Sequence, residues 1–116
     1  MIRFSITGQL KSGKNNMGIT RSGKHYPRPE WARWRDDVVD QLRAQDKRRQ
    51  AIDAPCSIVV SYTAGDRIRR DVPGILDAMF HCFERADIIA DDRWFVNVKW
   101  LSYYEAGKPR ASIRIY

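Results

Sequence analysis

The spacing between hydrophobic residues changes along this chain, and that change limits the folds it can adopt more than any other feature. Four segments alternate apolar and polar residues, which is typical of strands with one buried face. Two others, 29–45 and 72–85, repeat apolar residues at intervals of three and four, which predicts amphipathic helices. The predicted strands cover 2–7, 56–64, 94–101 and 110–116.

The order of these elements is β-α-β-α-β-β. Each predicted helix has one apolar face to bury, and a single sheet offers a surface for both. We therefore predict an α+β fold, with a mixed sheet of about four strands and two packed helices. A length of 116 residues and a hydrophobic content of 43% fit one folded domain over residues 1–116.

A long segment rich in glycine and proline separates the first strand from the first helix. Residues 8–29 have no regular apolar period, so we expect a loop without regular structure, which at this length is usually functional or disordered. No acidic residue occurs between Met1 and Pro29. Near the end of this segment, Tyr26 is the aromatic side chain to test for DNA contact, because the tryptophans are expected in the core.

The chain carries a strong excess of positive charge. Lysine and arginine number 21 against 14 aspartate and glutamate, which gives a formal net charge of +7. Such an excess favours polyanionic partners, because basic side chains that contact phosphates release bound counterions. The candidates for nucleic acid binding in and after the loop include Lys11, Arg67, Arg69 and Arg70.

The cysteine content and the hydrophobic runs indicate a cellular compartment. Cys56 and Cys82 are isolated and lack CxxC spacing, so they are poor zinc ligands and we expect packed thiols. No apolar run approaches the length of a membrane span, and the amino terminus lacks the long hydrophobic stretch of a secretory signal. We expect a cytoplasmic protein that does not associate with a membrane.

Three aspartates border the second predicted helix. Asp71 stands before it, and Asp91 with Asp92 follows it, just before the next strand. If the sheet brings these carboxylates together, they supply what Mg²⁺ needs for phosphodiester hydrolysis. Alternatively, Asp71 is a helix cap and the later pair belongs to a charged turn. The spacing alone leaves both interpretations open.

Taken in order, these residues resemble the RusA family of Holliday junction resolvases, phage-type endonucleases that act on four-way DNA junctions. The similarity extends over nearly the whole chain: an opening strand with "SIT", a basic loop with "SGKNNM", a helix with "WRDDVVDQL" and a basic run into Asp71. The most specific feature is the separation between Asp71 and the pair Asp91 and Asp92, which matches the family without a gap.

The resemblance implies a Mg²⁺-dependent endonuclease, with Mn²⁺ as a substitute, that nicks a Holliday junction symmetrically. It also implies a homodimer with an active site in each subunit and branched DNA as the partner. Asp71 and Asp92 would bind the metal, with Asp91 adjacent in the catalytic site. The loop residues that the resemblance places near the DNA are Lys14, Asn15 and Asn16.

The chain departs from the family motif at three positions. The family shows Asp-x-Asp-Asn followed three residues later by lysine, whereas this chain has Pro73, Gly74 and Asp77 at the last three of these positions. Mg²⁺ tolerates water in place of one carboxylate. The missing lysine removes a positive charge that would stabilise the transition state, and an arginine of the segment 67–70 is the candidate to replace it.

Asp77 and His81 lie four residues apart on the second predicted helix. Side chains at this spacing can meet, so the pair is a candidate auxiliary site for weak metal binding or proton transfer. Solvated surface is the alternative.

Two further functions stay open beside the junction endonuclease. One is a catalytically impaired protein that binds branched DNA by charge and shape. The other is a small RNA-binding α+β domain that uses the basic loop.

Overall fold

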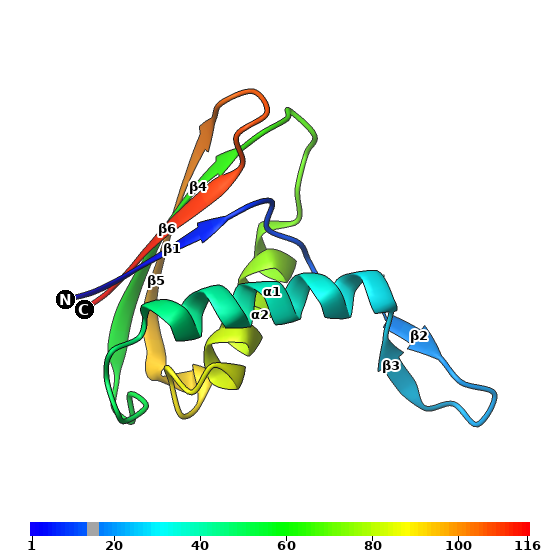
Figure 1. Ribbon diagram of the computed structural model, residues 1–116, viewed down its shortest axis with the longest axis horizontal. Coiled ribbons are helices and arrows are strands. Elements are labelled where there is room, and N and C mark those ends of the chain that lie inside the picture. Colours follow the sequence, from blue (N-terminus) through cyan, green and yellow to red (C-terminus); the bar gives the residue numbers. More distant parts are fainter. Residues whose placement is uncertain (14–16) are drawn as a thin grey trace.

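The four predicted strands form one sheet, and both predicted helices pack on the same face of it (Figure 1). The computed structural model describes residues 1–13 and 17–116. Its elements are β1 (Ile2–Thr7), β2 (Met17–Ile19), β3 (His25–Pro27), α1 (Pro29–Gln45), β4 (Cys56–Ala64), α2 (Val72–Arg85), the short 3-10 helix η1 (Asp92–Trp94), β5 (Phe95–Tyr104) and β6 (Arg110–Ile115).

The sheet has the strand order β1-β6-β4-β5. Strand β4 pairs parallel with β5, whereas β6 pairs antiparallel with both β1 and β4, so the sheet is mixed. The α2 crossover links the two parallel strands, as parallel pairing requires. The predicted α+β fold with two packed helices is confirmed.

Strand register keeps the apolar residues on the face that the helices cover. Ile58 lies opposite Ile115, and Val60 lies opposite Ile113, so every second residue of β4 and β6 enters the core. From α2, Phe83 meets Phe4 of β1 edge to face, with ring centroids 5.7 Å apart. The apolar residues of the helices and of the strands therefore form one core, and neither helix covers the opposite face of the sheet.

Two glutamines of α1 close one edge of the sheet. Gln45 accepts a hydrogen bond from the backbone amide of Ser5 and donates one to its carbonyl, at 2.7 Å each. One turn earlier, Gln41 makes the same two bonds with Thr7. These amides take the place of a neighbouring strand along β1. Strand β5 forms the other edge, and no strand of the described chain pairs with its outer side.

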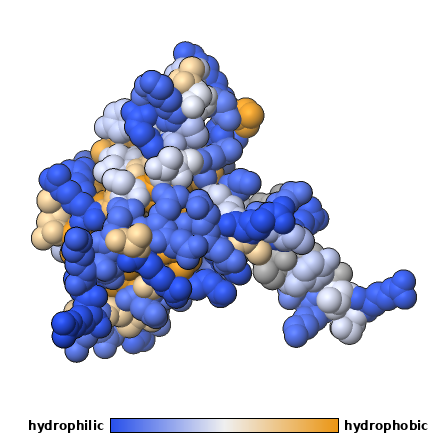
Figure 2. Space-filling view, in the orientation of Figure 1, coloured by the Kyte–Doolittle hydropathy of each residue, from blue (hydrophilic) through white to orange (hydrophobic). Residues whose placement is uncertain are grey.

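The expectation that residues 8–29 lack regular structure is wrong in part. β2 and β3 form an antiparallel hairpin that projects from the body as an arm (Figure 1), and the outer part of this arm is hydrophilic in Figure 2. Its turn closes because Gly23 adopts a φ of 84° and donates its amide to the carbonyl of Thr20. On β3, Tyr26 is 45% exposed. The predicted DNA contacts Lys14, Asn15 and Asn16 lie outside the described residues.

Both cysteines are buried free thiols, which confirms the prediction that they pack in or near the core. Burial raises the pKa of Cys56, and it raises the pKa of Cys82 to about 12. These thiols stay protonated at neutral pH and are unsuited to metal binding or nucleophilic chemistry. Among the described residues, no helix has the length and hydrophobicity needed to cross a membrane.

Candidate nuclease site

Asp71 lies at the amino end of α2, but its carboxylate does not cap the helix. The residue occupies the N-cap position and its side chain makes no capping hydrogen bond. The backbone carbonyl of Asp71 accepts from the amide of Ile75 at 3.0 Å, which starts the helix. The capping interpretation therefore accounts for the place of Asp71 in the chain but not for its carboxylate, which makes no capping hydrogen bond.

The buried Gly74 gives the Asp71 carboxylate its position. A Cβ atom at Gly74 would collide with the hydroxyl of Ser12 and with an oxygen of Asp71. The loop before α1 and the acid before α2 thus both occupy the space over the first turn of the helix. Any larger residue at this position would displace the carboxylate, which gives a structural reason for a glycine where the family motif has asparagine.

An open basic groove surrounds Asp71. This Asp71 groove has a volume of about 410 Å³, and its lining includes Lys11, Ser12, Arg69, Arg70 and Asp71. A positive helix end and these cations together favour a negative group here, either the carboxylate itself or a phosphate. The structure therefore brings predicted DNA contacts from two distant segments together around a predicted metal ligand.

The arginines of the segment 67–70 differ in their surroundings. Arg70 forms two hydrogen bonds with Asp66, at 2.6 and 2.9 Å, which hold the pKa of that carboxyl below its usual value. Arg67 lies over the ring of Tyr104, 4.5 Å from its centroid. Arg69 is exposed, with no ion pair to another described residue. Of the three, Arg69 has the greatest freedom to contact a phosphate.

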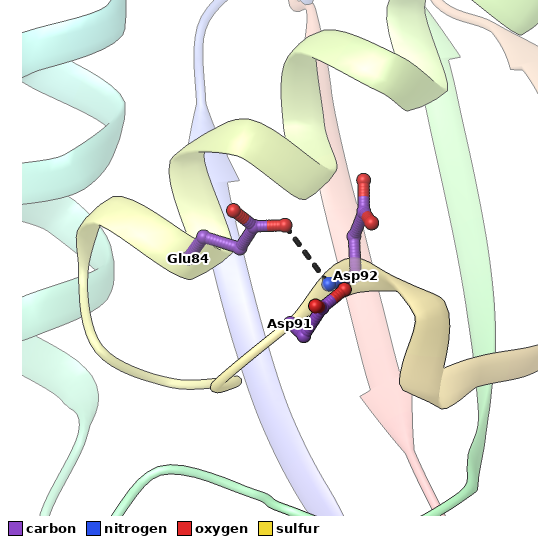
Figure 3. A group of neighbouring side chains, drawn as sticks. All are labelled: Glu84, Asp91 and Asp92. Atoms are coloured by element: carbon purple, nitrogen blue, oxygen red, sulfur yellow. Dashed lines mark hydrogen bonds between the residues drawn. The ribbon is translucent and has the colours of Figure 1, made fainter.

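A cluster of three carboxylates lies at the other end of α2. One ligand oxygen each from Glu84, Asp91 and Asp92 lies within 4.8 Å of the other two. Figure 3 shows Glu84 on the last turn of α2, and Asp91 and Asp92 on the segment that leads into β5. We call these three residues the acidic cluster.

Local hydrogen bonds fix the cluster. An oxygen of Glu84 accepts from the backbone amide of Asp92 at 2.8 Å, as the dashed line in Figure 3 marks. Asp91 accepts from the amide of Arg93 at 2.9 Å and caps η1. The chain reverses after α2 because Asp87 takes the left-handed conformation, with a φ of 58°.

The donor set of the acidic cluster suits a hard divalent cation. All three side chains offer carboxylate oxygens, which Mg²⁺ and Mn²⁺ prefer. Three carboxylates at the negative end of a helix repel one another, although Arg43 donates to the carbonyl of Arg85 there, at 2.7 Å. The Arg93 guanidinium is 3.7 Å from Asp91 and 70% exposed, so it neutralises the cluster weakly. A bound cation would offset the remaining repulsion.

Helix α2 keeps Asp71 away from Asp92. The helix has 14 residues, so it is about 21 Å long, with Asp71 at its start and the acidic cluster at its end. Figure 1 shows the two ends of α2 well apart. The expectation that the sheet of one chain draws these acids together is therefore wrong, because the rigid helix between them fixes their separation.

The auxiliary pair of Asp77 and His81 stays a prediction, and the described structure gives it little support. No hydrogen bond joins the two side chains, and neither belongs to a cluster of metal-ligating groups within the described residues. The His81 ring instead lies beside Trp31 of α1, with centroids 6.2 Å apart. Burial, followed by the charges of Arg35 and Arg85, lowers the pKa of His81.

Sequence reasoning missed Glu84. A separation of eight residues between Glu84 and Asp92 does not predict contact, because the conformation of the turn between them sets the distance between their side chains. An acid in the last turn of a helix, just before a short reversal and a second acidic pair, is the signal that could have found it. Glu84 joins Asp91 and Asp92 as a candidate ligand.

Comparison with known proteins supports the family resemblance. The chain is 28% identical over 108 residues to a protein of Aquifex aeolicus (strain VF5) named crossover junction endodeoxyribonuclease RusA. The match covers 92% of this chain and 85% of the relative. No protein family model matches the chain. The similarity spans nearly the whole chain, confirms the resemblance inferred from the sequence and supports its placement in the RusA family.

Proposed function

We propose that the protein is a structure-specific endodeoxyribonuclease that cleaves four-way DNA junctions by paired symmetric nicks and requires Mg²⁺. The similarity to a crossover junction endodeoxyribonuclease supports the reaction class. The observation that carries the proposal within this structure is the acidic cluster, because its oxygen donors suit Mg²⁺ or Mn²⁺. The basic Asp71 groove supports a DNA substrate.

In this proposal the acidic cluster binds the metal, and the basic residues of the groove bind the DNA. A cation held by Asp92, with Glu84 and Asp91, would lower the barrier to phosphodiester hydrolysis by withdrawing charge from the scissile phosphate. Lys11 and Arg69 hold the DNA backbone in the groove and orient it. Arg69 also stands in for the lysine that Asp77 replaces, because its guanidinium can approach the phosphate without breaking an ion pair to any residue that the structure describes.

A homodimer would bring Asp71 and Asp92 together, although they lie at opposite ends of α2 within one chain. Consider a two-fold contact in which α2 of one subunit runs antiparallel to α2 of its partner. Asp71 then lies beside Asp92 of the partner subunit, and the second pair forms by symmetry. In this arrangement the two equivalent active sites of the dimer lie about one length of α2 apart. We propose that each active site combines Asp71 of one subunit with the acidic cluster of the other.

The surface beside α2 has the composition of such an interface. On α2, Leu76 and Phe80 are only partly buried, and Phe80 packs against Phe95 at the start of β5 with centroids 4.8 Å apart. Val96 and Val98 of the β5 edge are 57% and 43% exposed. Apolar groups next to an unpaired strand edge favour association with a second copy.

The interface can be tested by charge insertion on β5. Val98→Lys places a cation at the proposed contact and should convert a dimer into a monomer in sedimentation velocity experiments, with loss of cleavage. A matched Lys99→Gln change on the opposite face of the same strand should leave the dimer intact. A wild-type protein that sediments as a monomer at all concentrations used for cleavage would contradict the shared site.

The reaction itself is tested with a labelled four-way junction in Mg²⁺ or EDTA. Symmetric cuts in Mg²⁺ and none in EDTA are the expected result. A retarded complex without cuts would favour the alternative function, a binding protein for branched DNA, for which Asp77 at the lysine position is the supporting observation. Preference for structured RNA over every DNA substrate would favour the RNA-binding alternative.

A further inference from the structure

The face of the sheet that the helices leave uncovered is basic. Strand register places one row across the whole sheet, from Arg3 of β1 through Arg114 of β6 and Val59 of β4 to Lys99 of β5. Arg110 projects from the same face. The register gives this face no acidic residue, and its uncharged polar members are Ser5, Thr7, Ser57, Ser61, Thr63, Asn97, Tyr103 and Ser112. We call this surface the open sheet face.

Three of its cations lack a neutralising partner. Arg3 lies directly opposite Arg114 on the neighbouring strand, and like charges in this arrangement destabilise a sheet. Within the described chain, neither forms an ion pair, and neither does Lys99. Arg110, by contrast, lies 2.7 Å from Glu105. The unpaired row thus has a cost in the free protein that a bound anion would remove.

The geometry of the row favours an extended polyanion. Neighbouring strands are about 4.8 Å apart, so the row from Arg3 to Lys99 spans about 14 Å. A duplex offers a phosphate every 3.4 Å or so of axis on each strand, which provides several contacts over that length. Serine and threonine hydroxyls beside the cations are common donors to phosphate oxygens. A second copy stacked on this face would instead set arginine against arginine, which repulsion disfavours.

We propose that the open sheet face is a second DNA-contacting surface, which holds a duplex arm of the branched substrate by its phosphates. This inference rests on the proposed junction endonuclease and extends it. The face lies across the sheet from α2, so it contacts a different part of the DNA from the Asp71 groove. A junction with several arms is a substrate that can meet both surfaces.

The test replaces the three unpaired cations with threonine, which removes their charges and favours the strand conformation. A variant with Arg3→Thr, Lys99→Thr and Arg114→Thr should bind a four-way junction in EDTA at least about tenfold more weakly at roughly 0.1 M salt. The slope of log affinity against log salt should fall by about 0.9 for each lost phosphate contact. The melting temperature should stay unchanged or rise, because the Arg3 and Arg114 repulsion is gone.

A matched variant controls for overall charge. Arg33→Gln, Lys47→Gln and Arg49→Gln remove the same charge from exposed positions on and after α1, and the salt slope of this variant should stay near that of the wild type. Equal slopes for the wild type and the sheet variant, or equal losses in both variants, would overturn the inference and leave the nuclease proposal intact. A wild-type protein without affinity for junctions would overturn both.

A milder variant covers the case in which the triple variant folds poorly. Lys99→Thr changes one exposed residue on the edge strand β5. It should lower the salt slope by about one, at an unchanged melting temperature. An unchanged slope in this folded variant would remove Lys99 from the DNA contact and overturn the row as a unit.

Discussion

The two ends of helix α2 hold acids in opposite electrostatic settings. At its amino end, Asp71 shares a groove with Lys11 and Arg69, next to the positive end of the helix. At its carboxyl end, the acidic cluster gathers three carboxylates where the helix is negative. At the amino end, the basic residues of the groove offset the negative charge of Asp71. The second end would gain most from an added cation, so the comparison favours our proposal that the cluster is the main metal-binding element and Asp71 its complement.

The largest expected effect tests whether these two ends meet between subunits. Asp71→Asn and Asp92→Asn should each abolish junction cleavage, since each removes a charge from both sites of the proposed dimer. Coexpressed, the two variants form mixed dimers in which one site has both native acids. With random pairing, about one quarter of the wild-type sites should return, which the junction cleavage rate measures.

Two controls accompany the mixing experiment. Each variant alone should still bind the junction as well as or better than the wild type, because loss of negative charge cannot weaken attraction to phosphate. A double variant that carries both changes, mixed with either single variant, should recover nothing. Full inactivity of the mixed single variants would place each site within one chain and break the comparison.

The next effect concerns Glu84. Glu84→Gln should lower kcat for junction cleavage by about 10- to 100-fold, as loss of a supporting carboxylate does at other metal sites. The amide oxygen of glutamine can still accept the bond from the Asp92 amide, so the turn should persist. The melting temperature should therefore change little, which thermal unfolding can check.

Glu84→Ala separates charge from structure at this position. It removes both the carboxylate and the hydrogen bond, so the melting temperature should fall as well. Undiminished cleavage by Glu84→Gln would exclude Glu84 from the metal site and reduce the cluster to its two aspartates.

A smaller effect is expected from metal binding on stability. A cation that binds only the folded protein raises its unfolding free energy, by about 2.7 kcal/mol at 100 times Kd. For the wild type, Mg²⁺ or Mn²⁺ should raise Tm by several degrees in thermal unfolding. The double change Asp91→Asn with Asp92→Asn should remove this shift, and Asp71→Asn should reduce it. A shift that depends on Asp71 alone would reverse the roles of the two ends.

The smallest effect concerns the ion pair that borders the Asp71 groove. Arg70 holds the pKa of Asp66 below its usual value, so this carboxylate stabilises the fold above its unfolded pKa of about 3.9. The stabilisation is lost as the pH falls through the lower folded pKa. Asp66→Asn should lower Tm at pH 7 by no more than about 2 °C, and the difference should vanish in strong acid.

The same variant sharpens the comparison between the two ends. It removes the negative charge that pairs with Arg70, so junction affinity should rise modestly, by less than about tenfold. The Mg²⁺ response of Tm should not change, because Asp66 is remote from the acidic cluster. A change in that response would link the groove to the metal.

Periodicity in the sequence determined the helices, the four main strands and their common core. Val72–Arg85 is a helix as predicted, because its apolar residues fall on one side at helical spacing and bury against the sheet whatever its neighbours are. The mixed sheet and the buried cysteines follow from the same local patterns. The small hairpin β2 and β3 escaped prediction because glycine and proline dominate its sequence and backbone pairing holds it together.

Only the tertiary structure decided how the acids are grouped. Distances between residues far apart in sequence depend on rigid elements and turns, which composition and spacing do not report. Thus the length of α2 keeps Asp71 from Asp92, and the reversal at Asp87 brings in Glu84. Register likewise set Arg3 opposite Arg114, since a shift of one residue would send each side chain to the other face.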